Sequence, residues 1–387
     1  MYIYIIVGLA VAIPFFAPRK YKQVALVISL LLLLIPWGFQ YRVSWDWPVY
    51  VERWQTVQYG ENIIGNRTLE PGYVWLMQLC HPIGFFGFLI LCGIFVLSIL
   101  YLFIKKYVSP KWYWLSILIL MSNMRLGFLL IDTNRQTLSL DFSMLATYLL
   151  LYDGKRLKIK NIYKYIISLL LLLFATQIHT SAYFAFILLF VLFFVKYVSK
   201  IKFFTSSVIF NIFYWGRYFM NISAFQGWME SKWLDISIVS NDMSFFTGYM
   251  EQIGTQEERF TFTYYFVSLF LCHAFLFLYN RLSVPYKFFG MSMLLFYMME
   301  GYMLKDLPRV LVYMNIYSVL IIPRIFQNSS IVWNGAFIKK SSLLSFMFFL
   351  VVIIYCWFFH MGVTQNKYYE RWSSDFRTTI FDAPKWM

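Results

Sequence analysis

The side chains with the greatest capacity for chemistry are a few arginines, carboxylates and one histidine scattered among apolar residues. They are Arg42, Asp46, Glu70, Arg135, His179, Asp306 and Arg309. A guanidinium offers a planar fork of donors that suits the oxygens of a phosphate group. A carboxylate or an imidazole can accept a proton from an attacking hydroxyl. If the fold gathers them, these residues could bind a phosphorylated substrate and assist a group transfer.

Each of these residues also has a purely structural explanation. Arg42 and Asp46 are four positions apart and could form a surface ion pair that contributes little stability. Glu70 precedes a Pro-Gly pair and could cap a short helix. Arg135 could anchor a helix end to lipid headgroups. His179 could be a buried, hydrogen-bonded structural histidine. The residue types alone leave both explanations open.

The elements that must position these residues are hydrophobic helices. The chain is 60% hydrophobic and only 13% charged, which is typical of an integral membrane protein. Apolar runs long enough to cross a bilayer number about twelve. Their ranges are 2–17, 23–39, 84–104, 112–131, 136–152, 164–179, 181–198, 203–222, 261–280, 288–304, 310–326 and 343–362. We therefore predict an all-α polytopic membrane protein.

Charge distribution predicts how these spans alternate. Lys and Arg residues follow the first apolar run rather than precede it, so it is not a signal peptide. Alternate loops at 18–22, 105–111, 153–164, 196–202, 281–287 and 324–340 hold 19 of the 33 Lys and Arg residues and one of the 18 acidic residues. This asymmetry predicts that these loops are cytoplasmic and that both termini lie outside. The net charge of +15 then faces lipid headgroups, and we expect no nucleic-acid partner.

The remaining polar residues concentrate on the outer side of a single membrane domain, 1–387. That side holds loops 40–83 and 223–260 and the C-terminal tail 363–387. Pro71 can start a short helix from Gly72 to about Leu79, too short to span and therefore interfacial or re-entrant. Cysteines form no CxxC pair, and no compact ligand spacing predicts a metal or another cofactor.

The seven candidate residues come from distant parts of the chain but map to one predicted face. Independent caps and anchors would be expected on both faces, so the clustering favours an outward-facing site. Most of the abundant Trp and Tyr residues are explained by an interfacial aromatic belt, although some could stack on sugar rings.

Four short motifs resemble those of the EpsG group of Wzy-type polysaccharide polymerases, membrane proteins of capsule, exopolysaccharide and O-antigen synthesis. They are "RVSWDWPVY" with Arg42, Asp46 and Tyr50, "EPGY" at Glu70 to Tyr73, "NRQ" at Asn134 to Gln136, and "QIHTSA" at Gln177 to Ala182. They occur in the family order over roughly the first 185 residues, and "LPR" at Leu307 to Arg309 is a weaker match.

This resemblance implies a GT-C-like helical bundle in the bacterial plasma membrane with its site facing the exterior. It implies transfer of a growing glycan from undecaprenyl pyrophosphate to a sugar hydroxyl of a new lipid-linked unit. Membrane lipids and a chain-length regulator are the other partners it allows. The residues for pyrophosphate and substrate binding would be Arg42, Arg135, Gln136, Arg309, Tyr50 and Tyr73. The candidate bases would be Glu70, His179 and Asp46, with the first two ranked equally.

Other functions remain open at this point. A transporter or flippase of lipid-linked sugars would place its polar site near the bilayer midplane, whereas these residues collect near one boundary. An O-antigen ligase would share the donor chemistry and differ in its acceptor. A membrane acyltransferase using a cytoplasmic acyl donor should also carry catalytic polar residues on the inner side.

Overall fold

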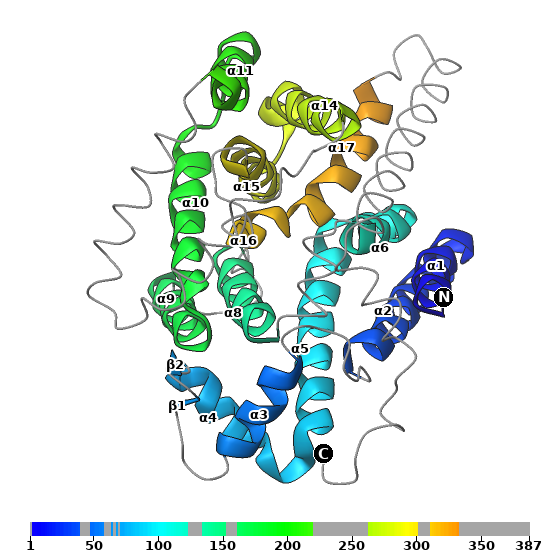
Figure 1. Cartoon of the computed structure of the whole chain (residues 1–387). Helices are drawn as coiled ribbons and strands as arrows, with labels where there is room; N and C mark the ends of the chain where they lie inside the picture. Colours follow the sequence, from blue (N-terminus) through cyan, green and yellow to red (C-terminus); the bar gives the residue numbers. More distant parts are fainter. Residues whose placement is uncertain are drawn as a thin grey trace.

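The computed structural model describes residues 2–38, 47–57, 63–64, 67–68, 70–122, 134–151, 161–219, 262–300 and 310–332 (Figure 1). Nearly all of them are helical, which confirms the predicted all-α class. The exception among them is a hairpin of two antiparallel strands, β1 (Ile63–Ile64) and β2 (Arg67–Thr68).

The long helices coincide with the apolar runs. They are α1 (Tyr2–Phe16), α2 (Lys22–Gly38), α5 (Gly84–Tyr107), α6 (Tyr113–Ser122), α8 (Asn134–Leu151), α9 (Asn161–Ile178), α10 (Ile187–Tyr197), α11 (Phe203–Phe219), α14 (Phe262–Leu278), α15 (Val284–Glu300) and α17 (Ser318–Val332). The run at 181–198 begins as the 3-10 helix η4 (Thr180–Phe186). The predicted span 343–362 lies outside the described residues.

Two continuous helical stretches among the described residues are long and apolar enough to cross a membrane, Pro71–Tyr107 and Thr180–Tyr197. Shorter apolar helices cover Ile5–Phe16, Ile162–Ile178 and Phe266–Arg281. Several of their outward side chains are exposed and apolar, such as Phe190 at 74%. Such a surface suits lipid rather than water. The total of about twelve spans remains a prediction.

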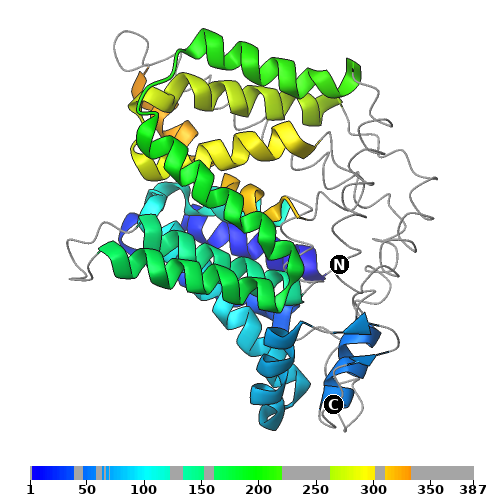
Figure 2. The same ribbon diagram turned by 90° about the vertical axis from the view of Figure 1, so that its left-hand side faces the viewer.

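Short helices connect or cover the long ones. The predicted short helix after Pro71 is confirmed as α4 (Pro71–Cys80). It turns into α5 through η2 (His81–Ile83) at Gly84, whose φ of 76° suits glycine. Sequence analysis did not predict α3 (Trp47–Val57), which packs on α4. Figure 2 shows α3 and α4 at one edge of the bundle, with α11 and α14 at the other.

Helix packing and contacts between aromatic rings form the bundle core. α9 packs on α8, while α2 packs on both α1 and α5. The rings of Phe289 and Tyr317 stack with centroids 5.5 Å apart, joining α15 to α17 through the segment before it. Gly290 lets α15 approach the ring of Phe275 on α14, because any Cβ there would overlap that ring. α16 (Val312–Asn315) is buried between α8, η4 and α15.

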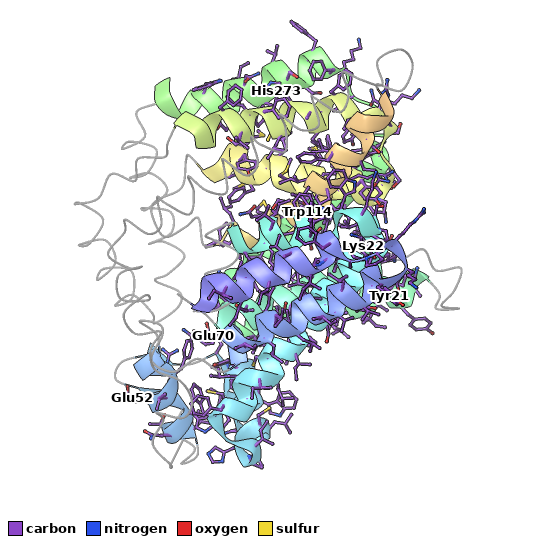
Figure 3. The ribbon with its side chains drawn as sticks, turned by 90° about the vertical axis from the view of Figure 1, so that its right-hand side faces the viewer. Tyr21, Lys22, Glu52, Glu70, Trp114 and His273 are labelled. Carbon is purple, nitrogen blue, oxygen red and sulfur yellow. The ribbon has the colours of Figure 1, made fainter. Side chains whose placement is uncertain are left out.

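The loops predicted to share one membrane face meet at one end of the bundle. The Tyr286 hydroxyl donates to the Tyr107 carbonyl at 2.8 Å, linking 281–287 to α5. The Lys287 ammonium donates to the Ser199 carbonyl at 2.5 Å. Figure 3 shows Lys22 at one end of α1 and α2 and Glu70 toward the other. The described part of the chain therefore has a basic end and a separate end that carries Glu70.

Candidate functional site

An ion pair between Glu70 and Arg135 lies at the centre of the candidate site. Arg135 Nη1 is 2.6 Å from Glu70 Oε2, and the two side chains are 20% and 14% exposed. The Thr180 N–H points to the other carboxylate oxygen at 3.4 Å. Burial, the largest influence, opposes ionisation of Glu70. Arg135, His179 and backbone N–H groups together outweigh it, so the pKa of Glu70 lies below its ordinary value. Three segments distant in sequence therefore meet at one carboxylate.

The two side chains contact each other, which neither structural explanation predicted. Glu70 occupies the N-cap position of α4, but its side chain makes no capping hydrogen bond and turns to Arg135 instead. Arg135, in the first turn of α8, faces this carboxylate rather than reaching alone toward headgroups. Both side chains are thus directed into the protein at the same place.

A glycine in the "EPGY" motif allows this meeting. A Cβ on Gly72 would lie 2.8 Å from the carbonyl oxygen of Gln177 and 2.9 Å from its Cβ. Contacts that short require the backbones of α4 and α9 to separate. Only glycine therefore lets the start of α4 lie against the end of α9, where it brings Glu70 beside Thr180 and His179.

Two predicted tyrosines surround the ion pair. The Arg135 guanidinium carbon lies 5.9 Å from the centre of the Tyr73 ring, a cation–π distance. The rings of Tyr50 and Tyr73 are 6.5 Å apart, and the Tyr50 side chain hydrogen-bonds to Arg135. Gln136 is buried beside Arg135 in α8. The structure thus gathers Glu70, Arg135 and both tyrosines.

His179 is held by the chain that follows it. Its Nδ1 accepts a hydrogen bond from the Ser181 N–H at 3.1 Å and lies 2.7 Å from the Ser181 hydroxyl. A backbone N–H can only donate, so Nδ1 carries a lone pair and the neutral ring carries its proton on Nε2. Within the described residues Nε2 has no hydrogen-bond partner. His179 therefore offers a donor at its free edge.

The hydrogen bonds continue from His179 into the core. The Ser181 hydroxyl is 3.0 Å from the Tyr313 hydroxyl of α16, which also bonds to Ser139 of α8. Ser139 in turn donates to the Gln136 carbonyl at 3.0 Å. Sequence analysis missed Tyr313, because nothing in its flanking residues connects it with a segment 132 positions earlier. It fixes the position of Ser181 and, through it, of His179.

Arg53 of α3 was also missed, and the structure places it near this site. It is 7% exposed, and its charge interacts with those of Arg135 and Glu70. The signal that could have revealed it is spacing. Tyr50, Arg53, Trp54 and Val57 fall on one helix face, so an arginine occupies an otherwise apolar stripe.

Three predicted site residues, Arg42, Asp46 and Arg309, lie outside the described residues, as does Asp306. Among those described, no three His, Cys, Asp or Glu side chains gather at one point. His273 bonds to the Leu269 carbonyl at 2.7 Å and to Asn211 at 3.0 Å, as expected of a structural histidine. The pyrophosphate and base assignments of the individual residues stay predictions.

The arrangement can bind an anion and orient a neighbouring polar group. Arg135 is fixed by Glu70 and Tyr50, which lowers the entropy lost when it binds a ligand. Its Nε is buried without a hydrogen-bond partner within the described part of the chain, as is the Nε of Arg53. Both guanidinium groups therefore retain unused donors beside a histidine that also donates.

The model of the EpsG family matches residues 23–374, which is most of the chain. No curated protein and no solved structure matches.

Proposed function

This chain belongs to the EpsG family of Wzy-type polysaccharide polymerases, and from that premise we propose that it joins lipid-linked oligosaccharide repeat units. Membership indicates a membrane protein of polysaccharide biosynthesis with glycosyltransferase-like activity. The finer proposal is a donor on undecaprenyl pyrophosphate and a site facing the exterior of a bacterial plasma membrane. The charge asymmetry of the loops and the separation of the site from the basic end support that orientation.

In the proposed reaction, the bond between the anomeric carbon of the growing glycan and an oxygen of its lipid pyrophosphate breaks. The electron pair stays on the pyrophosphate. The anomeric carbon bonds to a sugar hydroxyl oxygen of the new unit, and the hydroxyl proton passes to a base. Negative charge grows on the leaving group, so a fixed cation beside it acts most strongly in the transition state.

The observation that carries this proposal is the Arg135–Glu70 pair. It lies at the end of the bundle opposite the basic loops, and an arginine with spare donors suits a pyrophosphate oxygen. Glu70 neutralises part of the charge and fixes the direction of the guanidinium. Arg135 would then stabilise the leaving group, and Glu70 would position Arg135.

His179 supports the same reaction as a hydrogen-bond donor. Because Nδ1 accepts from Ser181, the proton on Nε2 is available to a phosphate or sugar oxygen. Glu70 is already held by Arg135 and has a lowered pKa, so it is a weak proton acceptor. Asp46, the third candidate base, lies outside the described residues. We also propose that the helices form a GT-C-like bundle and that a chain-length regulator is a partner.

The test is the length of the surface glycan made by cells that lack this protein. We expect a single repeat unit without it, a ladder restored by wild type, and no ladder with Arg135→Ala at matched protein level. The control is Arg281→Ala, which removes an exposed arginine from η5 (Tyr279–Arg281) at the basic end. Normal polymer in the deletion would contradict polymerisation. Lipid-linked units trapped inside the cell would indicate a flippase instead.

A further inference from the structure

Arg53 occupies a position that an arginine rarely takes without a partner. It lies on the face of α3 that Tyr50, Trp54 and Val57 bury against α4 and α5, and its side chain is 7% exposed. Buried arginines are almost always paired, because removing the charge from water is costly. Burial, and then the nearby charge of Arg135, lower the pKa of Arg53. The presence of Arg53 at this buried position therefore requires an explanation.

No carboxylate in the described part of the chain forms an ion pair with Arg53. Glu52, the acidic residue of α3, is exposed, and Figure 3 shows it on α3 apart from Glu70. Glu70 is bound to Arg135 at 2.6 Å. The buried Nε of Arg53 has no hydrogen-bond partner among the described residues. Counting those residues alone, two arginines lie near one carboxylate, an excess of one positive charge.

The packing of α3 directs Arg53 to the same tyrosines that contact Arg135. The Trp54 ring stacks on His81 with centroids 5.3 Å apart and on Phe88 at the same distance, which fixes the rotation of α3 about its axis. The next turn back places Tyr50 against Tyr73. The charge of Arg53 interacts with both tyrosines, and Arg135 lies over the ring of one of them. Both guanidinium groups therefore lie near the same aromatic pair.

We propose that Arg53 is a second ligand of the lipid pyrophosphate, binding one phosphate group while Arg135 binds the other. The inference rests on the proposed function and adds a residue and a selectivity to it. Two arginine forks match two phosphate groups, so the site should prefer a prenyl diphosphate over the monophosphate. The excess positive charge is the charge that such a ligand neutralises.

A purely structural arginine and a ligand-binding arginine predict opposite effects on stability. If Arg53 only supported α3, its replacement would lower the thermal stability of the free protein. If it is held ready for an anion, Arg53→Met keeps a side chain of similar length and removes an uncompensated buried charge. The free Met variant should then unfold at the same temperature as wild type or higher, while binding is lost.

The experiment measures binding of farnesyl diphosphate and farnesyl monophosphate to the purified full chain in detergent. We expect Arg53→Met and Arg53→Gln to weaken diphosphate binding about 10- to 100-fold and monophosphate binding less. Arg53→Lys should recover part of the loss, because it restores charge without the fork. Arg281→Gln at the basic end is the matched control and should bind like wild type.

The outcomes separate this proposal from the proposed function. If the Arg53 variants bind the diphosphate like wild type while Arg135→Gln does not, the role of Arg53 is wrong and the function stands. If Arg53→Met loses binding only together with thermal stability, and Arg53→Lys recovers nothing, the residue is structural. If wild type itself binds neither prenyl phosphate, the proposed function and this role fail together.

Discussion

The two ends of the helix bundle both carry cations, but they use them differently. At the basic end, cations bind backbone carbonyls. Lys22 Nζ lies 2.6 Å from the carbonyl oxygen of Pro14 and 3.0 Å from that of Phe15, where α1 ends. Lys287 donates to Ser199, between α10 and α11. A cation at the carboxyl end of a helix meets unpaired carbonyls and the negative end of the helix dipole. These cations are satisfied by the protein itself.

At the site end, the arginines are buried and retain unused donors. Arg135 has one carboxylate partner and a free Nε, and Arg53 has a free Nε and no acid partner among the described residues. This difference indicates which cations stabilise the fold and which act in the proposed reaction. Removing a cation that is satisfied by carbonyls should affect stability but hardly affect activity. Removing an unsatisfied one should affect activity far more than stability.

The largest expected effect is that of Arg135→Gln. Losing one fixed donor to a developing charge should lower the polymerisation rate by roughly 10²- to 10³-fold, measured with lipid-linked repeat units and purified protein. Thermal unfolding of the same sample tests whether the variant folds. A rate within about twofold of wild type would remove the distinction between the two ends.

Glu70→Gln should have the next largest effect, about tenfold or more on rate, because Arg135 loses its charged partner. The stability difference between wild type and this variant should also depend on pH. The folded pKa of Glu70 is lowered, so the pair stabilises the protein above the ordinary pKa and that stability is lost as pH falls through the folded value. The difference in melting temperature from wild type should stay constant above about pH 5 and shrink below about pH 4.

Wild type, whose melting temperature is measured over the same pH range, is the reference for this difference. A stability difference that disappears between neutral pH and pH 6 would mean that another group, rather than Glu70, is responsible.

Gly72→Ala tests the contact that brings α4 to α9. The added methyl group meets the Gln177 backbone, so we expect a loss of about 1–3 kcal/mol of stability and a lower rate from a displaced Glu70. Gly8→Ala is the matched control, because a Cβ there meets nothing within 4 Å. Equal melting temperatures for the two variants would show that α4 tolerates the displacement.

The smallest effect on the rate should come from Lys287→Gln at the basic end. It removes the cation–π contact with Tyr279 and a charged hydrogen bond to a carbonyl, the latter worth about 1.5–3 kcal/mol of stability, and should leave the polymerisation rate unchanged. Thermal unfolding and the same rate assay check both parts. A rate loss as large as that of Arg135→Gln would show that the basic end takes part in the reaction.

Much of the fold could be predicted from the sequence because its signals are local. Apolar runs of sufficient length become helices wherever they pack, and the described helices follow those runs closely. Pro71 at the first helical position marked the start of α4. The helix α3 was missed because its polar residues interrupt the apolar pattern, and its buried stripe becomes evident only once its partners are known.

The site could be predicted only in part. Glu70, Arg135 and His179 were identified because charged and polar residues are conspicuous in an apolar chain. Their common position at one boundary followed from counting spans. Nothing in the sequence could show that Glu70 turns to Arg135 instead of capping α4, or that Tyr313 reaches Ser181. Those contacts join segments separated by 65 and 132 positions.

The sequence by itself determined that this protein is helical, that it belongs in a membrane and that its cations divide between two ends. These properties follow from the composition of each segment, which is the same in any packing. The tertiary structure decided which cations are satisfied. Satisfaction depends on the burial and partners of individual atoms, such as the Nε of Arg53, and these exist only after α3, α4, α8 and η4 meet.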